Sequence, residues 1–335
     1  MTDPFWMPRM GLREDWLNRS PEPVLDPTRE IVDPHHHLWN RGGHVYETAQ
    51  LAADAGDGHN VVQTVYIECH SYYDTDAPEG FEPIGESRTV ADMATRLDAP
   101  SIAGIVAFAD LRRPDLDAIL DAHAQASGGL VKGIRQAGAF DSDPDVLRIK
   151  PRGQAGLYAD PDFRRGLARL AARGLTYDTW HYHHQAADFL ALARAVPDTT
   201  LVLDHFGTPL GVGRFEGQRD AIFPQWQQDM AALARCPNVV AKLGGLAMPD
   251  NGWRFEDRTA PPSSVELADL HGPWYRHMLD CFGPERCMFE SNFPVDRVSI
   301  SYGSLWNAFK IIAEPFDEDE KNALFSGTAR RIYRL

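Results

Sequence analysis

Two histidines separated by one residue are the feature of this sequence that most directly suggests chemistry. His35 and His37 follow Ile31-Val32-Asp33, an apolar start that is typical of a β-strand. Side chains at positions i and i+2 of a strand point to the same face, so the two imidazoles can converge on one point. Such a pair can bind a divalent metal, or hold a substrate and transfer a proton. We therefore predict a functional site at the end of this strand.

Eight apolar, β-branched segments alternate with helical patterns along the chain. The predicted strands are 31–32, 61–67, 102–108, 130–134, 175–177, 200–203, 239–243 and 287–289. Patterns rich in Ala, Leu and Arg predict helices between most of them, for example at 115–126, 162–173 and 226–235. Eight strand–helix alternations over about 300 residues favour an α/β fold of the (β/α)8 TIM-barrel type over an open sheet. We expect one catalytic barrel domain over residues 30–335.

The first 29 residues have a different composition from the rest of the chain. They contain five prolines and two tryptophans: Pro4, Pro8, Pro21, Pro23, Pro27, Trp6 and Trp16. This composition predicts an extended N-terminal arm, which either wraps around its own domain or reaches a neighbouring subunit. The sequence does not distinguish between these two arrangements, so a homo-oligomer remains an open possibility.

Polar residues gather just after the predicted strands. In a TIM barrel the catalytic residues lie at the C-terminal ends of the strands, so these side chains are expected to meet at one rim. Besides the two histidines, the candidates at this rim are Glu68, Arg135, Asp178, Trp180, His183, His205, Lys242, Asn292 and Asp296. The accumulation of histidines and carboxylates at one rim predicts a reaction site more strongly than any single motif does.

Four segments of the chain resemble the amidohydrolase-related group of TIM-barrel hydrolases. Residues 33–39 are similar to the family's D-x-H-x-H-L-W opening, and residues 133–135 to its fourth-strand arginine motif. Residues 203–209 resemble its D-H-x-G-x-P sixth-strand motif, and residues 282–296 its G-x-x-R-x-x-x-x-S-D-W-P ending. The resemblance implies a relative of lactonases that act on sugar acids and pyrone dicarboxylates, some of which work without a tightly bound metal. More distantly, it implies kinship with non-oxidative decarboxylases of aromatic acids.

One residue departs from the family's pattern. Asn292 stands where the family's ending usually has an aspartate, which often serves as a metal ligand or as the base that activates water. An amide cannot take up a proton near neutral pH and is a poor metal ligand. Asp296, Glu68 or Glu290 could replace the aspartate, although the Glu290 side chain could equally face the barrel wall.

The metal ligands and catalytic groups are expected among the histidines and carboxylates. The expected ligands of a zinc or manganese ion are His35, His37, His205 and Glu68, and a metal-independent reaction stays open. The histidines, directly or through the metal, would polarise a substrate carbonyl beside Asn292. Glu68 or Asp296 would accept the proton from water. The alternative role of Asp296 is to cap a helix that begins near Ser301.

Substrate binding is expected to involve Arg135, which can form a bidentate pair with a carboxylate. The alternative interpretation of Arg135 is a structural salt bridge. Further substrate contacts are expected from Asp178, Trp180, His183 and Lys242. Asp178 could instead orient a histidine, and Lys242 could instead form a buried ion pair.

Charge and hydropathy limit the classes of partner. The formal net charge is −15 and is spread along the chain, which argues against a nucleic-acid or anionic-membrane partner. No apolar run approaches the roughly 20 residues of a membrane span, and the N-terminus lacks the features of a secretory signal. The four cysteines have no metal-site or disulfide spacing: Cys69, Cys236, Cys281 and Cys287. We expect a cytoplasmic protein with reduced thiols.

Together these features predict a hydrolase that opens a lactone or related cyclic ester of a carboxylated small molecule, with or without a divalent metal. The first alternative is a non-oxidative decarboxylase on the same barrel, which would release carbon dioxide without incorporating water. The second, from another class, is a non-catalytic barrel that binds a ligand, an interpretation that Asn292 leaves open.

Overall fold

Eight parallel strands form one sheet in the computed structural model, which describes residues 13–41 and 43–335. The strands are β1 (Glu30–His36), β4 (Asn60–Ile67), β5 (Ser101–Ala107), β6 (Val131–Arg135), β7 (Thr176–Thr179), β8 (Leu201–Leu203), β9 (Val239–Leu243) and β10 (Cys287–Phe289). Each strand pairs with the next one along the chain, in the order in which they are named here. This confirms the predicted TIM barrel and its eight strands.

The barrel closes between β1 and the segment that follows β10. His36 forms a parallel bridge with Phe293. The backbone N–H of His37 donates to the carbonyl of Phe293 at 2.8 Å, and that of Asn292 donates to the carbonyl of His35 at 2.9 Å. The first and last motifs of the sequence therefore become neighbours, and Asn292 lies beside the histidine segment.

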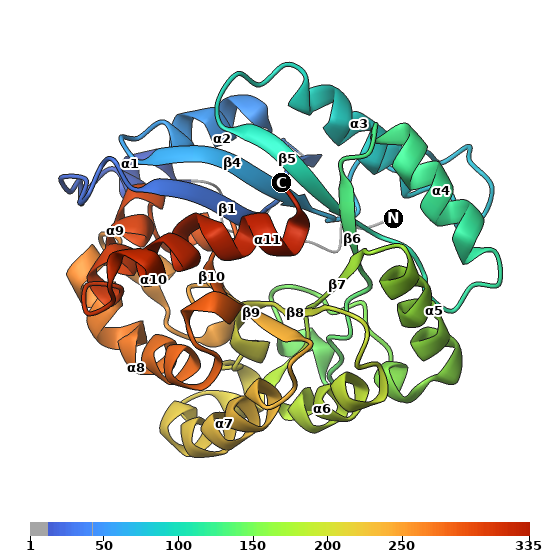
Figure 1. Ribbon diagram of the computed structural model, residues 1–335. Helices are drawn as coiled ribbons and strands as arrows, with labels where there is room; N and C mark the ends of the chain where they lie inside the picture. The colour runs from blue at the N-terminus through green and yellow to red at the C-terminus, as the bar shows by residue number, and fades with distance from the viewer. Residues whose placement is uncertain (1–12, 42) are drawn as a thin grey trace.

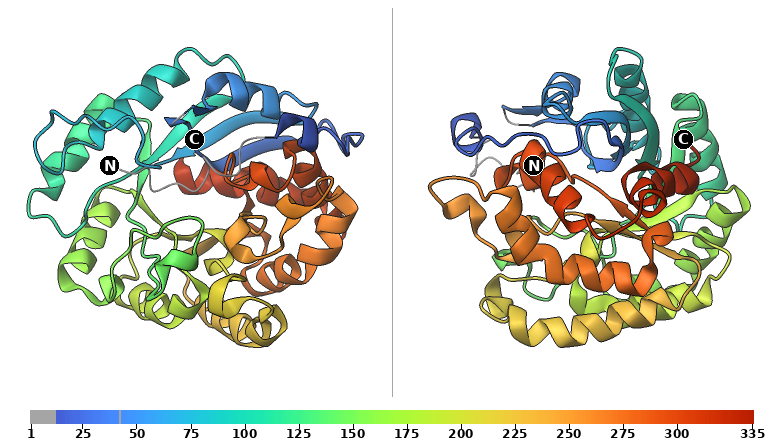
Figure 2. Two further views of the ribbon diagram at one scale, coloured as in Figure 1. Left: turned by 180° about the vertical axis from the view of Figure 1, so that it is seen from behind. Right: turned by 60° about the vertical axis from the view of Figure 1, so that its left-hand side comes forward.

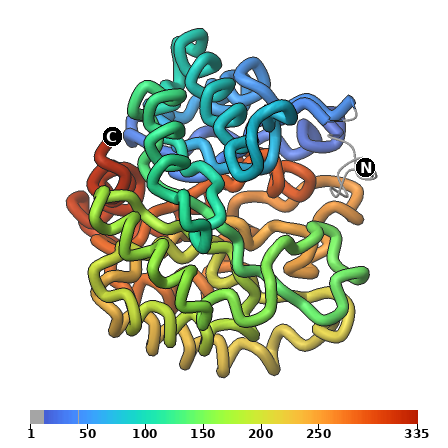
Figure 3. Tube along the Cα trace, turned by 90° about the vertical axis from the view of Figure 1, so that its right-hand side faces the viewer, coloured from blue at the N-terminus to red at the C-terminus, as the bar shows by residue number. Residues whose placement is uncertain are grey.

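Helices surround the barrel on the outside, as Figure 1 shows. They are α3 (Ile84–Ala94), α4 (Leu116–Ala126), α5 (Pro161–Ala172), α6 (Ala186–Ala195), α7 (Arg219–Ala234), α8 (Ser264–Phe282), α9 (Tyr302–Ile312) and α10 (Glu318–Asn322), and the chain ends with α11 (Thr328–Tyr333). The elements before α3 are α1 (Glu14–Leu17), the hairpin of β2 (Trp39–Arg41) and β3 (His44–Tyr46), and α2 (Thr48–Ala55). Figure 3 shows neighbouring helices packed side by side around the barrel wall.

Helix α5 shows how the local sequence sets an element. The Asp160 carboxylate accepts a hydrogen bond from the Phe163 backbone N–H, and Pro161 is the first helical residue, which is a typical N-terminal arrangement. Phe163, Leu167 and Leu170 recur at helical spacing and are buried against the barrel. The cap fixes where the helix begins, and the apolar stripe fixes which face lies on the sheet.

Helix α7 begins seven residues before its predicted start at residue 226. Pro224 lies inside the helix, where a proline removes one backbone hydrogen bond. Trp226, Met230 and Leu233 are buried on one face of this helix. Because each such side chain contributes about 1.5–3 kcal/mol on burial, their packing offsets the cost of the proline.

Helix α11 closes the end of the barrel opposite the strand C-termini, and in Figure 1 it lies across the front of the barrel. Ala329 and Tyr333 of this helix pack against a buried cluster inside the barrel. That cluster comprises Val32, Val65, Ile67, Val106, Val202, Val240 and Met288. Apolar side chains therefore fill this end of the barrel.

The described part of the N-terminal arm, residues 13–29, packs along α8 and α9 of its own chain. The Trp16 ring is buried, and its Nε1 donates to the Arg258 carbonyl at 2.8 Å. The Glu22 carboxylate accepts from the Ser264 backbone N–H at 2.7 Å. The right-hand view of Figure 2 shows this segment beside the helices that follow β9 and β10. Pro4, Trp6 and Pro8 lie outside the described residues.

Across residues 13–41 and 43–335, every helix is too short or too polar to cross a membrane.

Candidate active site

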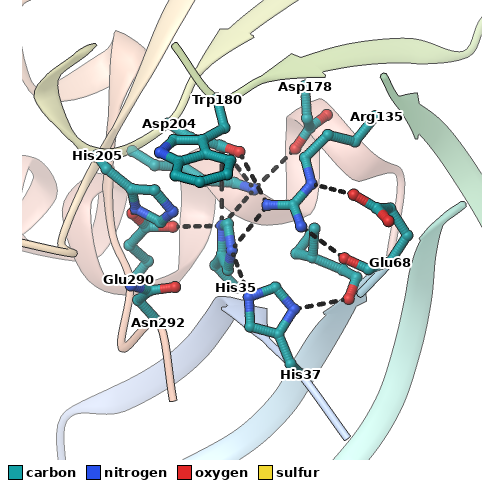
Figure 4. A network of polar contacts seen from close by, with 12 residues as sticks. His35, His37, Glu68, Arg135, Asp178, Trp180, Asp204, His205, Glu290 and Asn292 are labelled. Atoms are coloured by element: carbon teal, nitrogen blue, oxygen red, sulfur yellow. Dashed lines mark hydrogen bonds and ion pairs between the residues drawn. The ribbon is translucent and has the colours of Figure 1, made fainter. Parts of the chain in front are cut away.

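A pocket of about 580 Å³, part of it open to solvent, lies at the C-terminal ends of the strands. Six of the predicted site residues line it: His37, Glu68, Arg135, Trp180, His205 and Asn292. They come from the ends of six different barrel strands, so only the closed barrel brings them together. Figure 4 shows these side chains grouped around His35, which lies at the centre of the view.

The two histidines of the opening motif face each other. Their Nε2 atoms are 3.3 Å apart, and Nδ1 of His37 lies 2.9 Å from the Ile67 carbonyl oxygen. Because a carbonyl can only accept, Nδ1 of His37 must be the protonated nitrogen, and its Nε2 carries a lone pair. Burial lowers the pKa of both rings well below the usual range for histidine, so both are neutral. His37 thus presents an acceptor at the floor of the pocket.

Glu290, whose orientation the sequence left open, lies between two histidines. Its Oε1 is 2.6 Å from Nδ1 of His205, and its Oε2 is 2.8 Å from Nδ1 of His35. Burial alone would raise the pKa of Glu290, but the positive charge available on His205 lowers it to about 2. Burial likewise opposes protonation of His205, and the Glu290 carboxylate outweighs it, so the pKa of His205 is raised.

The Glu290 carboxylate fixes the orientation of the His205 ring. A carboxylate can only accept, so Nδ1 of His205 donates to it, and in the neutral form of the ring Nε2 carries the lone pair. Nε2 has no hydrogen-bond partner among the described residues, and His205 lines the pocket. A signal for Glu290 existed in the sequence, because Met288 points into the barrel and position 290 shares its face. Recognising it required knowing which face of β10 is the inner one.

Arg135 and Glu68 are bound to each other. Nε of Arg135 donates to Oε1 of Glu68 at 2.8 Å, and one terminal nitrogen donates to the Glu68 carbonyl at 2.5 Å. The other terminal nitrogen lies 3.6 Å from the Asp204 carboxylate. Burial raises the pKa of Glu68, but the Arg135 guanidinium has the larger net effect and keeps the pKa low. The arrangement is the structural salt bridge named as the alternative for Arg135, and Glu68 engages Nε and one terminal nitrogen of the guanidinium.

Asp178 and Lys242 lie beneath the pocket and do not line it. Both are fully buried, with Nζ of Lys242 at 2.7 Å from Asp178 and 3.3 Å from Asp204. Burial favours neutral lysine, but the two carboxylates raise the pKa of Lys242 and keep it charged. Tyr333 donates a further hydrogen bond to Asp178. These positions match the buried ion pair named as the alternative for Lys242, rather than contacts with a substrate.

Asn292 and Asp296 form a pair in which only the amide reaches the pocket. Nδ2 of Asn292 donates to Asp296 at 2.8 Å, and the backbone N–H of Ala247 donates to the same carboxylate at 3.2 Å. Burial raises the pKa of Asp296 to about 7. Helix α9 is capped by the hydroxyl of Ser301, which accepts from the backbone N–H of Ser304 at 3.2 Å, so Asp296 has no capping role there.

His183 stands away from the pocket. Its Nδ1 accepts a hydrogen bond from the Leu210 backbone N–H at 3.2 Å, and its ring packs edge-on against Phe215. His183 is not among the residues that line the pocket. Trp180, by contrast, lines the pocket, and its Nε1 donates to the Thr208 hydroxyl at 3.1 Å, which holds the indole in place.

Three side chains lie close enough to share a cation. Ligand atoms of His35, Asp204 and His205 are within 4.8 Å of one another. Both oxygens of Asp204 are buried without a hydrogen bond, although Lys242 and Arg135 balance the charge from 3.3 and 3.6 Å. Two imidazoles and a carboxylate with unused acceptor capacity fit a divalent metal. The other two expected ligands, His37 and Glu68, are not part of this group.

Comparison with known proteins places these features in a family. The amidohydrolase family model matches residues 32–335. An uncharacterized protein of Sinorhizobium fredii is 33% identical over an alignment of 331 positions, which covers 91% of this chain and 98% of that protein. An L-fucono-1,5-lactonase of Burkholderia multivorans is 31% identical over 252 residues, which are 75% of this chain and 78% of that protein.

The fold is also similar to that of a solved structure. The crystal structure of an amidohydrolase from Burkholderia multivorans with bound zinc has a TM-score of 0.72 and 26% identity. The match covers 91% of this chain and 99% of that chain. The barrel, the motifs at its rim and the family match agree, and they confirm the resemblance found in the sequence. The chain belongs to the amidohydrolase family and is a hydrolase of the amidohydrolase superfamily.

Proposed function

We propose that this protein hydrolyses a lactone, or a related cyclic ester, of a small carboxylated molecule. The observation that carries the proposal is the hydrogen-bonded pair of Glu290 and His205, which leaves a histidine lone pair directed to a pocket at the barrel rim. The similarity to an L-fucono-1,5-lactonase supports the same class of reaction.

The reaction adds water to the lactone carbonyl carbon, breaks the ring C–O bond and transfers a proton to the departing ring oxygen. Nε2 of His205 accepts the proton of the attacking water, and Glu290 stabilises the imidazolium that forms. The same imidazolium then gives its proton to the departing ring oxygen, which becomes the hydroxyl group of the opened product. Trp180 and Met248 offer an apolar wall for the face of the ring. Asn292 stands where the family usually has an aspartate that activates water. In this proposal Glu290 and His205 together perform that function.

A divalent metal, which we propose to be zinc or manganese, would be held by His35, Asp204 and His205. When bound, it would polarise the carbonyl and make the water more acidic. In that case Glu290 would still orient the His205 ring, because a carboxylate on Nδ1 directs Nε2 of a histidine toward a metal as well as toward a substrate. Nε2 of His205 would then bind the metal instead of accepting the proton of water.

Metal content tests this site directly. Protein purified without added metal and without a His tag is expected to contain one zinc or manganese per chain, measured by elemental mass spectrometry. The double substitution His35→Ala/His205→Ala is expected to remove the metal, whereas His183→Ala, outside the pocket, retains it. Equal metal content in all three proteins would contradict this ligand set.

Activity is tested on a panel of aldonolactones and carboxylated lactones, with proton release followed by a pH indicator and corrected for spontaneous opening. We expect kcat/KM of about 10⁴ M⁻¹ s⁻¹ or more for a good substrate. In H₂¹⁸O, one labelled oxygen is expected in the product carboxylate. Release of carbon dioxide without the label would indicate the decarboxylase alternative, and saturable binding without turnover would indicate a ligand-binding barrel.

A further inference from the structure

The pocket is lined by three cationic side chains, which differ in how they are bound. Arg135 is held by Glu68, as described above. Nζ of Lys150 donates to the Pro144 carbonyl at 3.0 Å and to Asp145 at 3.2 Å. Arg152 is exposed and forms no hydrogen bond or ion pair with any residue in the part of the chain that the structure describes. A ligand can therefore form an ion pair with the Arg152 guanidinium without breaking an existing contact between described residues.

The loop that carries Arg152 is fixed to the barrel. The Asp250 carboxylate accepts backbone hydrogen bonds from Arg148 at 2.7 Å and from Ile149 at 2.9 Å. The backbone N–H of Gly153 donates to the Ala139 carbonyl at 2.9 Å. Bonds on both sides of Arg152 restrict the loop, so the side chain extends from an anchored position at the pocket mouth. Because the loop is already anchored, ligand binding loses less conformational entropy in ordering it.

The charges around the pocket favour an anionic ligand at Arg152. The carboxylates nearest to the floor are already paired, Glu68 with Arg135 and Glu290 with His205. Arg152 lines the same pocket as Glu68 and His70. The protein as a whole is acidic, with a formal net charge of −15, so an unpaired arginine gives the mouth of the pocket a positive charge that the chain as a whole does not have.

We propose that Arg152 binds a second carboxylate of the substrate, one that is not part of the lactone ring. The substrate class is then a lactone of a dicarboxylic sugar acid or a similar diacid, and specificity for the acid rests on Arg152 rather than on Arg135. A guanidinium pairs with a carboxylate through two parallel hydrogen bonds, which an uncharged hydroxymethyl group cannot replace. This inference rests on the proposed lactonase function.

A matched pair of lactones tests it. D-glucaro-1,4-lactone and D-glucono-1,4-lactone share the ring and differ only in a carboxylate or a hydroxymethyl group at the far end. We expect the wild-type protein to prefer the glucarolactone, and Arg152→Gln to lower the ratio of the two kcat/KM values by about tenfold to a hundredfold, mainly through KM. Arg152→Lys should recover part of the ratio, and Arg96→Gln, an exposed arginine outside the pocket, should leave it as in the wild type.

Binding separates this inference from the proposed function. The dissociation constants of glucarate and gluconate, the ring-opened acids, are measured by isothermal titration calorimetry on the same variants. Weaker glucarate binding in Arg152→Gln but not in Arg96→Gln supports the inference even if neither lactone is opened, a result that would refute the lactonase function alone. The same glucarate affinity in both variants, or an unchanged ratio of kcat/KM values, would overturn the role of Arg152 while leaving a lactonase intact.

Discussion

Replacing His205 with alanine is expected to lower kcat by about 10³-fold or more. The imidazole is the group whose lone pair faces the pocket, and Glu290 holds it in the required tautomer at 2.6 Å. Both proposed roles of this ring, taking a proton from water and binding a metal, depend on Nε2, so the loss is expected with or without a metal. Steady-state hydrolysis of the best lactone of the panel measures it, beside a His183→Ala control that leaves the pocket unchanged.

Glu290→Gln distinguishes a positioning role from a general loss of structure. The amide keeps the size of the side chain and removes its charge, and we expect a fall in kcat of about 10–100-fold, smaller than for His205→Ala. Since Glu290 acts through His205, the double variant should lose little more than His205→Ala alone. Additive losses would show that Glu290 acts separately, and unchanged turnover in His205→Ala would refute the site. Near-ultraviolet circular dichroism verifies that each variant is folded.

Lys242→Met is expected to lower the free energy of unfolding by about 3–5 kcal/mol, the largest effect on stability that we predict. The ammonium group is fully buried between the carboxylates of Asp178 and Asp204 at 2.7 and 3.3 Å. Methionine fills a similar volume, but it leaves two buried carboxylates with less compensation, and removing one partner of a buried ion pair costs far more than the pair itself is worth. Urea unfolding monitored by tryptophan fluorescence measures the change.

A surface ion pair provides the matched control. Arg173 forms partly exposed ion pairs with Asp117 and Asp121. Arg173→Met is expected to lower the free energy of unfolding by no more than about 1 kcal/mol. Replacing both buried partners, in Lys242→Met/Asp178→Leu, should recover part of the stability because only Asp204 then remains without the lysine. A cost for Lys242→Met as small as that for Arg173→Met would show that the two carboxylates do not need the ammonium group.

The strands of the barrel can be predicted from the sequence without knowledge of its tertiary contacts. Residues 239–243 and 287–289 were predicted as strands with the bounds that the structure has for β9 and β10. Their success has a physical reason, because strands covered on both faces must be apolar and β-branched throughout, which leaves a signal that does not depend on distant contacts. The motifs around His35 and His205 likewise identified the rim and the family.

The orientation and partners of the rim side chains depend on contacts between residues that are far apart in the sequence. His205 and Asn292 have φ angles of 55° and 56°, in the left-handed region, so the alternation of faces that holds within a strand does not continue through them. Arg135 pairs with Glu68, 67 positions away, and Glu290 reaches His205, 85 positions away. Such pairs form because barrel closure places the strand ends side by side and excludes water from them. Each buried charge must then be matched by a neighbour that the local sequence does not contain.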